Sequence, residues 1–374
     1  MCARFLSRFL AAVLIAGCAS RPGGGPTGEN PSAVSISGYE PVTAERLAAE
    51  GWDTDFSRVA QSGGTIVTAG LSREAIVPVR NPRHAAAAGI DLDPAEPVLV
   101  LRGEDEVHAW PLAHLLKREL ALDEAGGVPV AVTFCSVCGT ARLWDRRVDG
   151  RVLELGVSGL LLDGNSLLWD AATESLWRQI DGRAVAGAMA GAAMESLPAF
   201  VVSFGVLAAA RPDARVMLTP EPAPDPPFRT LSGSDVARGE PPAWLAVACP
   251  RPLEPALVVG ESPVLAVAGP PVEHSGDLVV FRDSGAGTAY RTAGGGPSEP
   301  WGGAAAFRRD LDGRSLTFEP VPAAGRGPAS VLRFRDRETG SGWNLLGEAV
   351  EGPLAGRALR VADQILGFRF AVAP

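Results

Sequence analysis

The feature that most constrains the fold of this chain is an internal repeat. The pattern D-x-x-T-x-S-x-W occurs twice with identical spacing, at 170–177 and 336–343. A G-x-A-V-x-G sequence follows each copy, at 182–187 and 347–352. With weaker matches upstream, these patterns predict two diverged halves at about 97–187 and 255–352. A period of roughly 160 residues indicates a duplicated domain, because solenoid repeats are only 20 to 50 residues long.

Turn and strand signals predict that both halves are rich in β-structure. The run from Val130 to Phe134 is β-branched and apolar, and the Asp-Gly pairs at 149–150 and 312–313 lie between strand-like runs, which is a hairpin signal. The 44 glycines and 32 prolines favour short elements joined by turns. We therefore expect a mainly β (β-rich α+β) fold over residues 39–374, with few helices and with the two halves packed as one unit.

One helix is predicted ahead of the cysteines. Residues 111–122 begin with a proline at the first helical position and place leucines on one face. At 100° per residue, Glu119 falls inside this apolar stripe. A buried carboxylate is costly unless it is paired or coordinating, and burial would raise its pKa. Glu119 is therefore a candidate site residue, and a salt bridge with Arg118 or another arginine is the alternative.

The N-terminus carries an export signal. Residues 1–18 combine two arginines, a short apolar run and small residues before Cys18. This arrangement is similar to the lipobox of bacterial lipoproteins, which implies cleavage before Cys18 and lipid attachment to it; an ordinary secretory signal is the alternative. Residues 19–38 are rich in Gly and Pro and predict a flexible tether. We expect an exported protein anchored to the bacterial cell envelope, at the outer membrane if the cell has one, because Ala19 follows the cysteine.

Charge and motif content exclude several classes of function. The formal net charge is −9, from 34 basic and 43 acidic residues, which disfavours nucleic acid as a partner. The sequence contains neither a G-x-G-x-x-G motif nor a Walker loop, so no nucleotide cofactor is expected. The expected partners are the membrane, through the lipid anchor, and an envelope protein or a small ligand.

The strongest chemical signal is the C-x-x-C pair formed by Cys135 and Cys138. A strand-like sequence follows it, whereas the thioredoxin motif opens a helix that lowers the pKa of its first thiol, so a thioredoxin fold is disfavoured. The pair could form a redox-active or structural disulfide, bind a soft metal ion such as Cu or Zn, or remain inert. We expect Cys249 to be a small buried residue. The alternative is a role as a third metal ligand or as a resolving thiol.

Polar residues present in only one half are the better functional candidates, because positions shared by both halves are explained by the shared fold. Besides the cysteines, these candidates are Ser158, Asn165 and Gln179; Gln179 falls opposite Leu345. Trp177 recurs as Trp343, which indicates a core anchor. A ligand cleft lined by Trp177 is the alternative interpretation.

Residues from about 52 to 371 resemble the bacterial and archaeal domain-of-unknown-function family 3179. The resemblance rests on segments 109–112, 127–139, 157–161 and 170–187, and on the second Trp motif at 336–343. It implies no established activity. It also implies a His-Glu pair before the cysteines and commonly a proline after the first one. Here Arg118 precedes Glu119 and Ser136 takes the place of the proline.

Two classes of function remain open on the sequence. The first is a surface-tethered protein that performs thiol redox chemistry or binds a soft metal through Cys135 and Cys138, with Glu119 and Gln179 nearby. The second is a non-catalytic envelope module that binds a ligand or partner through the Trp177 face, in which the cysteines only brace a loop.

Overall fold

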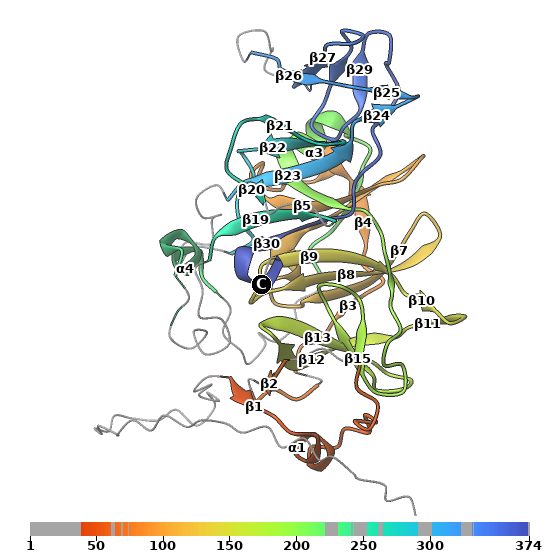
Figure 1. The fold of residues 1–374 in the computed structure, drawn as a ribbon, viewed down its shortest axis with the longest axis vertical. Coiled ribbons are helices and arrows are strands. Elements are labelled where there is room, and N and C mark those ends of the chain that lie inside the picture. The colour runs from red at the N-terminus through yellow and green to blue at the C-terminus, as the bar shows by residue number, and fades with distance from the viewer. Residues whose placement is uncertain are drawn as a thin grey trace, which may run out of the picture. The chain divides into compact units, whose positions relative to one another are not determined.

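The computed structural model describes residues 39–60, 64–68, 70–73, 75–220, 231–240, 242, 253–260, 265–290, 301–322, 331 and 333–372. Within these ranges strands predominate and helices are short, which confirms the prediction of a mainly β fold (Figure 1). The export signal, the tether, Cys18 and Cys249 lie outside the described residues.

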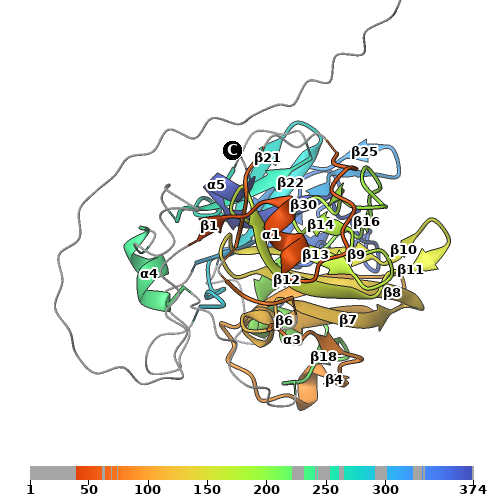
Figure 2. The same cartoon turned by 90° about the horizontal axis from the view of Figure 1, so that it is seen from below.

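A five-stranded sheet carries the two cysteines. In spatial order its strands are β16 (Glu195–Ser196), β9 (Thr140–Asp145), β8 (Val128–Cys135), β7 (Leu120–Ala125) and β3 (Val79–Arg80). β7, β8 and β9 form an antiparallel meander and lie side by side in Figure 2. Their β-branched and apolar residues are buried, as expected for a sheet that is covered on both faces.

A six-stranded sheet packs against this meander. In spatial order its strands are β1 (Glu40–Pro41), β2 (Ile66–Thr68), β12 (Leu155–Leu162), β13 (Asn165–Asp170), β14 (Leu176–Arg178) and β15 (Ala184–Ala186). Leu122 and Trp144 from the first sheet share a core with Leu168 and Trp177 from the second. This packing brings the start of β13 and the end of β14 up to the β8–β9 hairpin.

An eight-stranded sheet joins the two predicted halves. In spatial order its strands are β21 (Val272–Ser275), β22 (Leu278–Asp283), β23 (Gly303–Arg308), β17 (Phe200–Ser203), β5 (Pro97–Arg102), β6 (Val107–Pro111), β18 (Arg215–Met217) and β4 (His84–Ala86). Val201 of β17 pairs with Leu99 on one side and with Ala304 on the other. The backbone ladder therefore runs continuously from the first half into the second.

The remaining strands form small sheets and two hairpins. The three-stranded sheet has the order β20 (Leu265–Ala266), β19 (Pro255–Val259) and β30 (Gln364–Phe368), and the four-stranded sheet has the order β26 (Phe318–Pro320), β27 (Phe334–Asp336), β28 (Gly342–Trp343) and β29 (Ala349–Glu351). The hairpins are β10–β11 (Arg147–Val148 and Arg151–Val152) and β24–β25 (Asp310–Leu311 and Arg314–Ser315). Both turn at the predicted Asp-Gly pairs, whose four residues have positive φ.

The predicted helix over residues 111–122 is wrong beyond its first turn. The helix there, α2, covers only Leu112–Leu115, and β7 begins at Leu120. The apolar residues after position 119 belong to a strand buried on both faces, and a short apolar run of this kind does not distinguish a strand from a helix. The other helices are α1 (Ala44–Ala49), α3 (Phe204–Ala210), α4 (Gly233–Arg238), α5 (Arg369–Val372) and a 3-10 helix (Ala87–Gly89). In the described part of the chain, no helix has the length and apolar character needed to cross a membrane.

The two copies of the Trp motif adopt the same local structure. Asp170 accepts hydrogen bonds from the Trp177 indole at 3.0 Å and from the Thr173 hydroxyl at 2.7 Å. Asp336 accepts the equivalent bonds from Trp343 and Thr339, both at 2.9 Å. Leu155 pairs with Asp170 as Phe318 pairs with Asp336, which gives both copies the same strand register. These shared contacts agree with a duplication, and the common origin of the two halves stays a prediction.

Candidate functional site

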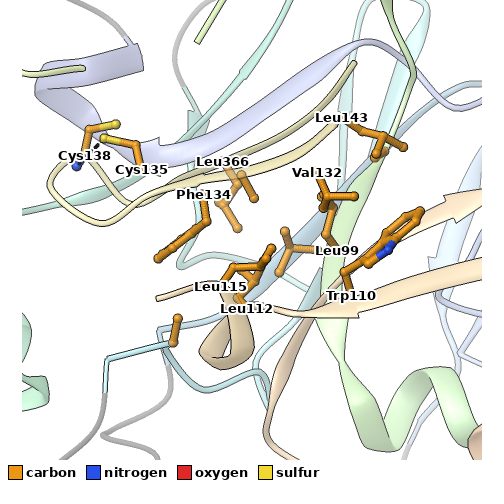
Figure 3. Close-up of a cluster of buried hydrophobic side chains, with 14 of the residues drawn as sticks. Leu99, Trp110, Leu112, Leu115, Val132, Phe134, Cys135, Cys138, Leu143 and Leu366 are labelled. Atoms are coloured by element: carbon orange, nitrogen blue, oxygen red, sulfur yellow. Dashed lines mark hydrogen bonds between the residues drawn. The ribbon is translucent and has the colours of Figure 1, made fainter. Parts of the chain in front are cut away.

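The two cysteines lie at the turn of the β8–β9 hairpin. Cys135 ends β8 opposite Thr140, and Cys138 lies within the four-residue turn between them. Both are free thiols with no exposed surface, and Figure 3 shows their sulfur atoms side by side. The Cys138 N–H donates to Cys135 Sγ at 3.2 Å, and Gly139 closes the turn with φ +66°. The turn therefore holds the pair close together and buried.

A chain of side-chain hydrogen bonds surrounds Cys138. Its sulfur lies 2.9 Å from the Thr140 hydroxyl and accepts from the Asn165 amide at 3.2 Å. The Gln179 carbonyl accepts from both Thr140 and Asn165, at 2.8 and 2.9 Å. The bonds to Thr140 and Asn165 lower the pKa of Cys138, so they oppose the effect of its burial.

The pKa values of the two thiols are shifted in opposite directions. Burial raises the pKa of Cys138 well above its usual value, and the neighbouring Cys135 raises it further. Burial also raises the pKa of Cys135, but the hydrogen bonds from Cys138 and from Ser166 bring it below its usual value. Cys135 is therefore the sulfur that forms a thiolate, and Cys138 is the sulfur that keeps its proton.

Glu119 lies beside this pair in the turn between α2 and β7. Its backbone has φ +55°, and its N–H and C=O bond to Leu115 O and Phe134 N at 2.7 and 2.9 Å. These bonds aim the side chain inward, where its carboxylate accepts from the Ser136 hydroxyl and N–H and, at 3.4 Å, from the Ser166 hydroxyl. Burial raises the pKa of Glu119 to about 7, although the Ser136 bonds oppose the shift. The predicted burial is confirmed, but the predicted helical position is not.

A small cavity is lined in part by Glu119. It offers about 20 Å³ to the centre of a water molecule, which is room for a single water. Tyr39, Ser136 and Ser166 contribute hydroxyl-bearing side chains to its lining, together with apolar residues of β12. Neither cysteine lines it. Glu119, unlike the two cysteines, therefore lines a water-sized space.

The structure brings together most, but not all, of the predicted site residues. Cys135, Cys138, Glu119, Asn165 and Gln179 form one hydrogen-bonded cluster. Ser158 instead accepts from Leu160 N and donates to Leu167 O, at 3.0 and 2.6 Å, and braces an irregularity in β12. Trp177 is completely buried, which agrees with a core anchor and leaves its ring without an exposed face for a ligand.

Sequence reasoning missed five members of the site. Thr133 accepts from the Gln179 amide at 2.8 Å, and Tyr290 donates to Ser136 O at 2.9 Å. Four of the missed residues had a usable sequence signal. Thr133, Ser136 and Thr140 each carry a hydroxyl two positions from a cysteine, and Ser166 follows Asn165 directly. No signal pointed to Tyr290, which arrives from a segment far along the chain.

Side chains from the C-terminal part of the chain pack against the cysteine turn. Phe368 N donates to Cys138 O at 2.9 Å, so strand β30 is tied to the turn. A Cβ at Gly139 would meet the rings of both Phe368 and Trp301 at 3.1 Å. Tyr290 lies on the same side and stacks on Phe368, with ring centroids 6.0 Å apart. A reagent therefore reaches the sulfurs only when this cover moves.

Within the described ranges, no group of three or more His, Cys, Asp or Glu side chains is arranged to hold a metal ion. The cluster supplies two sulfurs, and its carboxylate is engaged by Ser136 and Ser166. Metal binding by Cys135 and Cys138 stays a prediction from the sequence.

Comparison with known proteins identifies a family for the segment that contains this cluster. Residues 73–228 match the family "Protein of unknown function (DUF3179)". The match confirms the resemblance over residues 73–228, and this segment contains every residue of the hydrogen-bonded cluster from Glu119 to Gln179. The cover formed by Tyr290, Trp301 and Phe368 lies beyond the matched residues. No curated protein and no solved structure matches the chain.

Proposed function

We propose that this protein is an exported, lipid-anchored thiol–disulfide redox protein in which Cys135 and Cys138 interconvert between dithiol and disulfide. The observation that carries the proposal is a pair of free thiols held in one turn, in which the Cys138 N–H donates to Cys135 Sγ at 3.2 Å. The directions of the pKa shifts support it, because they make Cys135 the more acidic sulfur, and exchange needs one sulfur to attack and the other to resolve. The similarity of residues 1–18 to a lipobox supports the proposed lipid anchor at the cell envelope.

The proposed exchange is balanced in electrons and protons. The Cys135 thiolate attacks one sulfur of a partner disulfide and forms a mixed disulfide, and the partner's other sulfur leaves as a thiolate. Cys138 then loses its proton and attacks Cys135 Sγ, which releases the second partner thiolate. Two electrons pass to the partner, whose thiolates take up the two protons of the dithiol. The cover over the turn must open to admit the partner.

The test is a redox titration of the untagged domain in dithiothreitol buffers of graded potential. We expect one reversible two-electron transition, with a loss of two hydrogens that maps to Cys135 and Cys138. Cys135→Ser and Cys138→Ser should each abolish it, and Cys249→Ser is the matched control that should leave it intact.

Two results would overturn the proposal. One is a pair of thiols that stays reduced at every potential, which would favour inert side chains. The other is a metal ion in the native mass spectrum that is lost in Cys135→Ser, which would favour the metal-binding function predicted from the sequence. A binding module that uses the Trp177 face has no support, since that side chain is buried.

A further inference from the structure

The sulfurs are sealed from solvent, but a route for their protons is present. Cys135 neighbours Ser166, whose hydroxyl and backbone N–H lie within hydrogen-bonding reach of its sulfur. The same Ser166 hydroxyl lies 3.4 Å from Glu119 Oε2. Glu119 and Ser166 both line the water-sized cavity. The Ser166 hydroxyl therefore links the neighbourhood of the Cys135 thiol to the Glu119 carboxylate.

We propose that Glu119 is the proton carrier of the dithiol, and that it exchanges protons with Cys135 through the Ser166 hydroxyl. This inference rests on the proposed redox function. In the forward step the Cys135 proton moves to Ser166 Oγ while the Ser166 proton moves to Glu119 Oε2. The products are a thiolate and a neutral carboxylic acid, and the step transfers no electrons. The reverse step returns the proton when the dithiol is restored.

The surroundings make Glu119 the one group of this cluster suited to the task. The other titratable groups that face it are Cys135, Tyr39 and Tyr290. Burial raises the pKa of both tyrosines above its usual value, and the charge on Glu119 raises it further, so both hydroxyls keep their protons at neutral pH. A group that carries protons works best when its pKa lies near the working pH. Glu119, with a pKa of about 7, meets that condition.

The position of the Glu119 carboxylate also avoids the free-energy cost of an additional buried negative charge. Forming a thiolate next to an ionised carboxylate would place two negative charges together without solvent, which is strongly unfavourable. Moving the proton from Cys135 to Glu119 keeps the total charge of the cluster constant. The cavity beside Glu119 then lets the carboxyl exchange its proton with water while the sulfurs remain covered.

The test follows hydrogen–deuterium exchange of the Cys135 thiol in the reduced protein, through its S–H stretching band in the infrared. The band is assigned by its loss in Cys135→Ser. In the wild-type protein we expect exchange to accelerate as the pH rises through about 7, where Glu119 ionises. Glu119→Gln and Ser166→Ala should each slow exchange at pH 8 by tenfold or more and remove the pH dependence.

Two further variants separate the relay from a structural effect. Ser166→Thr keeps a hydroxyl and should retain most of the exchange rate. Ser158→Ala removes a buried hydroxyl that does not contact Glu119, and it should exchange as the wild type does. Wild-type exchange in both Glu119→Gln and Ser166→Ala would overturn the relay. The experiment needs neither partner nor oxidant, so its failure is distinct from the failure of the redox titration.

Discussion

At residue 136 a serine supplies two of the donors that hold the Glu119 carboxylate. Its hydroxyl and its N–H both reach Oε1, and both lower the pKa of Glu119 against the effect of burial. A proline, which the family resemblance places at this position, has neither donor. Ser136 therefore tunes the acidity of the cluster in a way that a relative with proline does not share.

Ser136→Ala tests this role directly. The variant loses the hydroxyl donor but keeps the N–H, so we expect the pKa of Glu119 to rise further, by about one unit if the bond contributes about 1.4 kcal/mol. The carboxyl carbon shift of Glu119 in a nuclear magnetic resonance titration measures the pKa. An unchanged pKa would show that the hydroxyl bond contributes nothing in solution.

Glu119 also makes stability depend on pH. Its pKa rises from 4.5 to about 7 on folding, so between these values the folded state holds a proton that the unfolded chain has released. Stability is therefore full below about pH 4.5 and falls as the pH rises to about 7, by on the order of 3 kcal/mol. We expect Glu119→Gln to remove this fall and to be the more stable protein at pH 8. Urea unfolding at pH 4.5, 6 and 8 measures it, and parallel curves for both proteins would contradict the expectation.

At the scale of elements, the D-x-x-T-x-S-x-W motif holds a turn and the following strand together through hydrogen bonds within the motif. Asp170 is fully buried and accepts from Thr173 N, Thr173 Oγ1 and Trp177 Nε1 at 2.7 to 3.0 Å. The bonds join the turn after β13 to strand β14. The second copy repeats them in β27 and β28, so its contribution to folding should match the first.

Asp170→Ala and Asp336→Ala should therefore destabilise the protein by similar amounts, about 2 to 5 kcal/mol each. Each change leaves an indole N–H and a backbone N–H buried without an acceptor. Urea denaturation measures both losses. Asp310→Ala, in the exposed β24 strand, is the control and should cost less than 0.5 kcal/mol. A loss below 1 kcal/mol in either motif variant would show that the brace is not essential there.

At the scale of the whole molecule, the matched family segment depends on residues that follow it. Strand β17 pairs with strands of both halves, and β30 ties the end of the chain to the cysteine turn. Phe368 is fully buried there and packs with Tyr290, Trp301 and Phe370. Residues near the far end of the sequence therefore pack against the turn that holds the thiols.

Phe368→Ala should open the cover. We expect iodoacetamide to modify the cysteines at least tenfold faster in native buffer, because a fully buried ring that packs against the turn is gone. Phe334→Ala is the matched control, since Phe334 is equally buried but packs on Phe281 in a different core. Both changes should cost about 3 to 5 kcal/mol. Equal alkylation rates in the two variants would show that global instability, and not the cover, sets access.

Local patterns in the sequence were enough to determine the β-rich class, the two Asp-Gly hairpins and part of the polar cluster. These depend on neighbours a few residues apart: strand periodicity, turn chemistry, and the comparison of the two halves that singled out Asn165 and Gln179. The same comparison also singled out Ser158, which braces β12 away from the sulfurs, because a residue specific to one half can still be structural.

Tertiary structure decided what local patterns leave ambiguous. Residues 120–125 became a strand because their backbone groups pair with β8, and the leucine spacing alone fits a helix equally well. Glu119 therefore has a left-handed backbone conformation, and its carboxylate contacts Ser136 and Ser166. Tyr290 and Phe368 reached the cysteines through packing over more than 150 residues of chain, as the 154-residue separation of Tyr290 and Ser136 shows. Contacts at that separation arise from the whole fold, and no short sequence pattern encodes them.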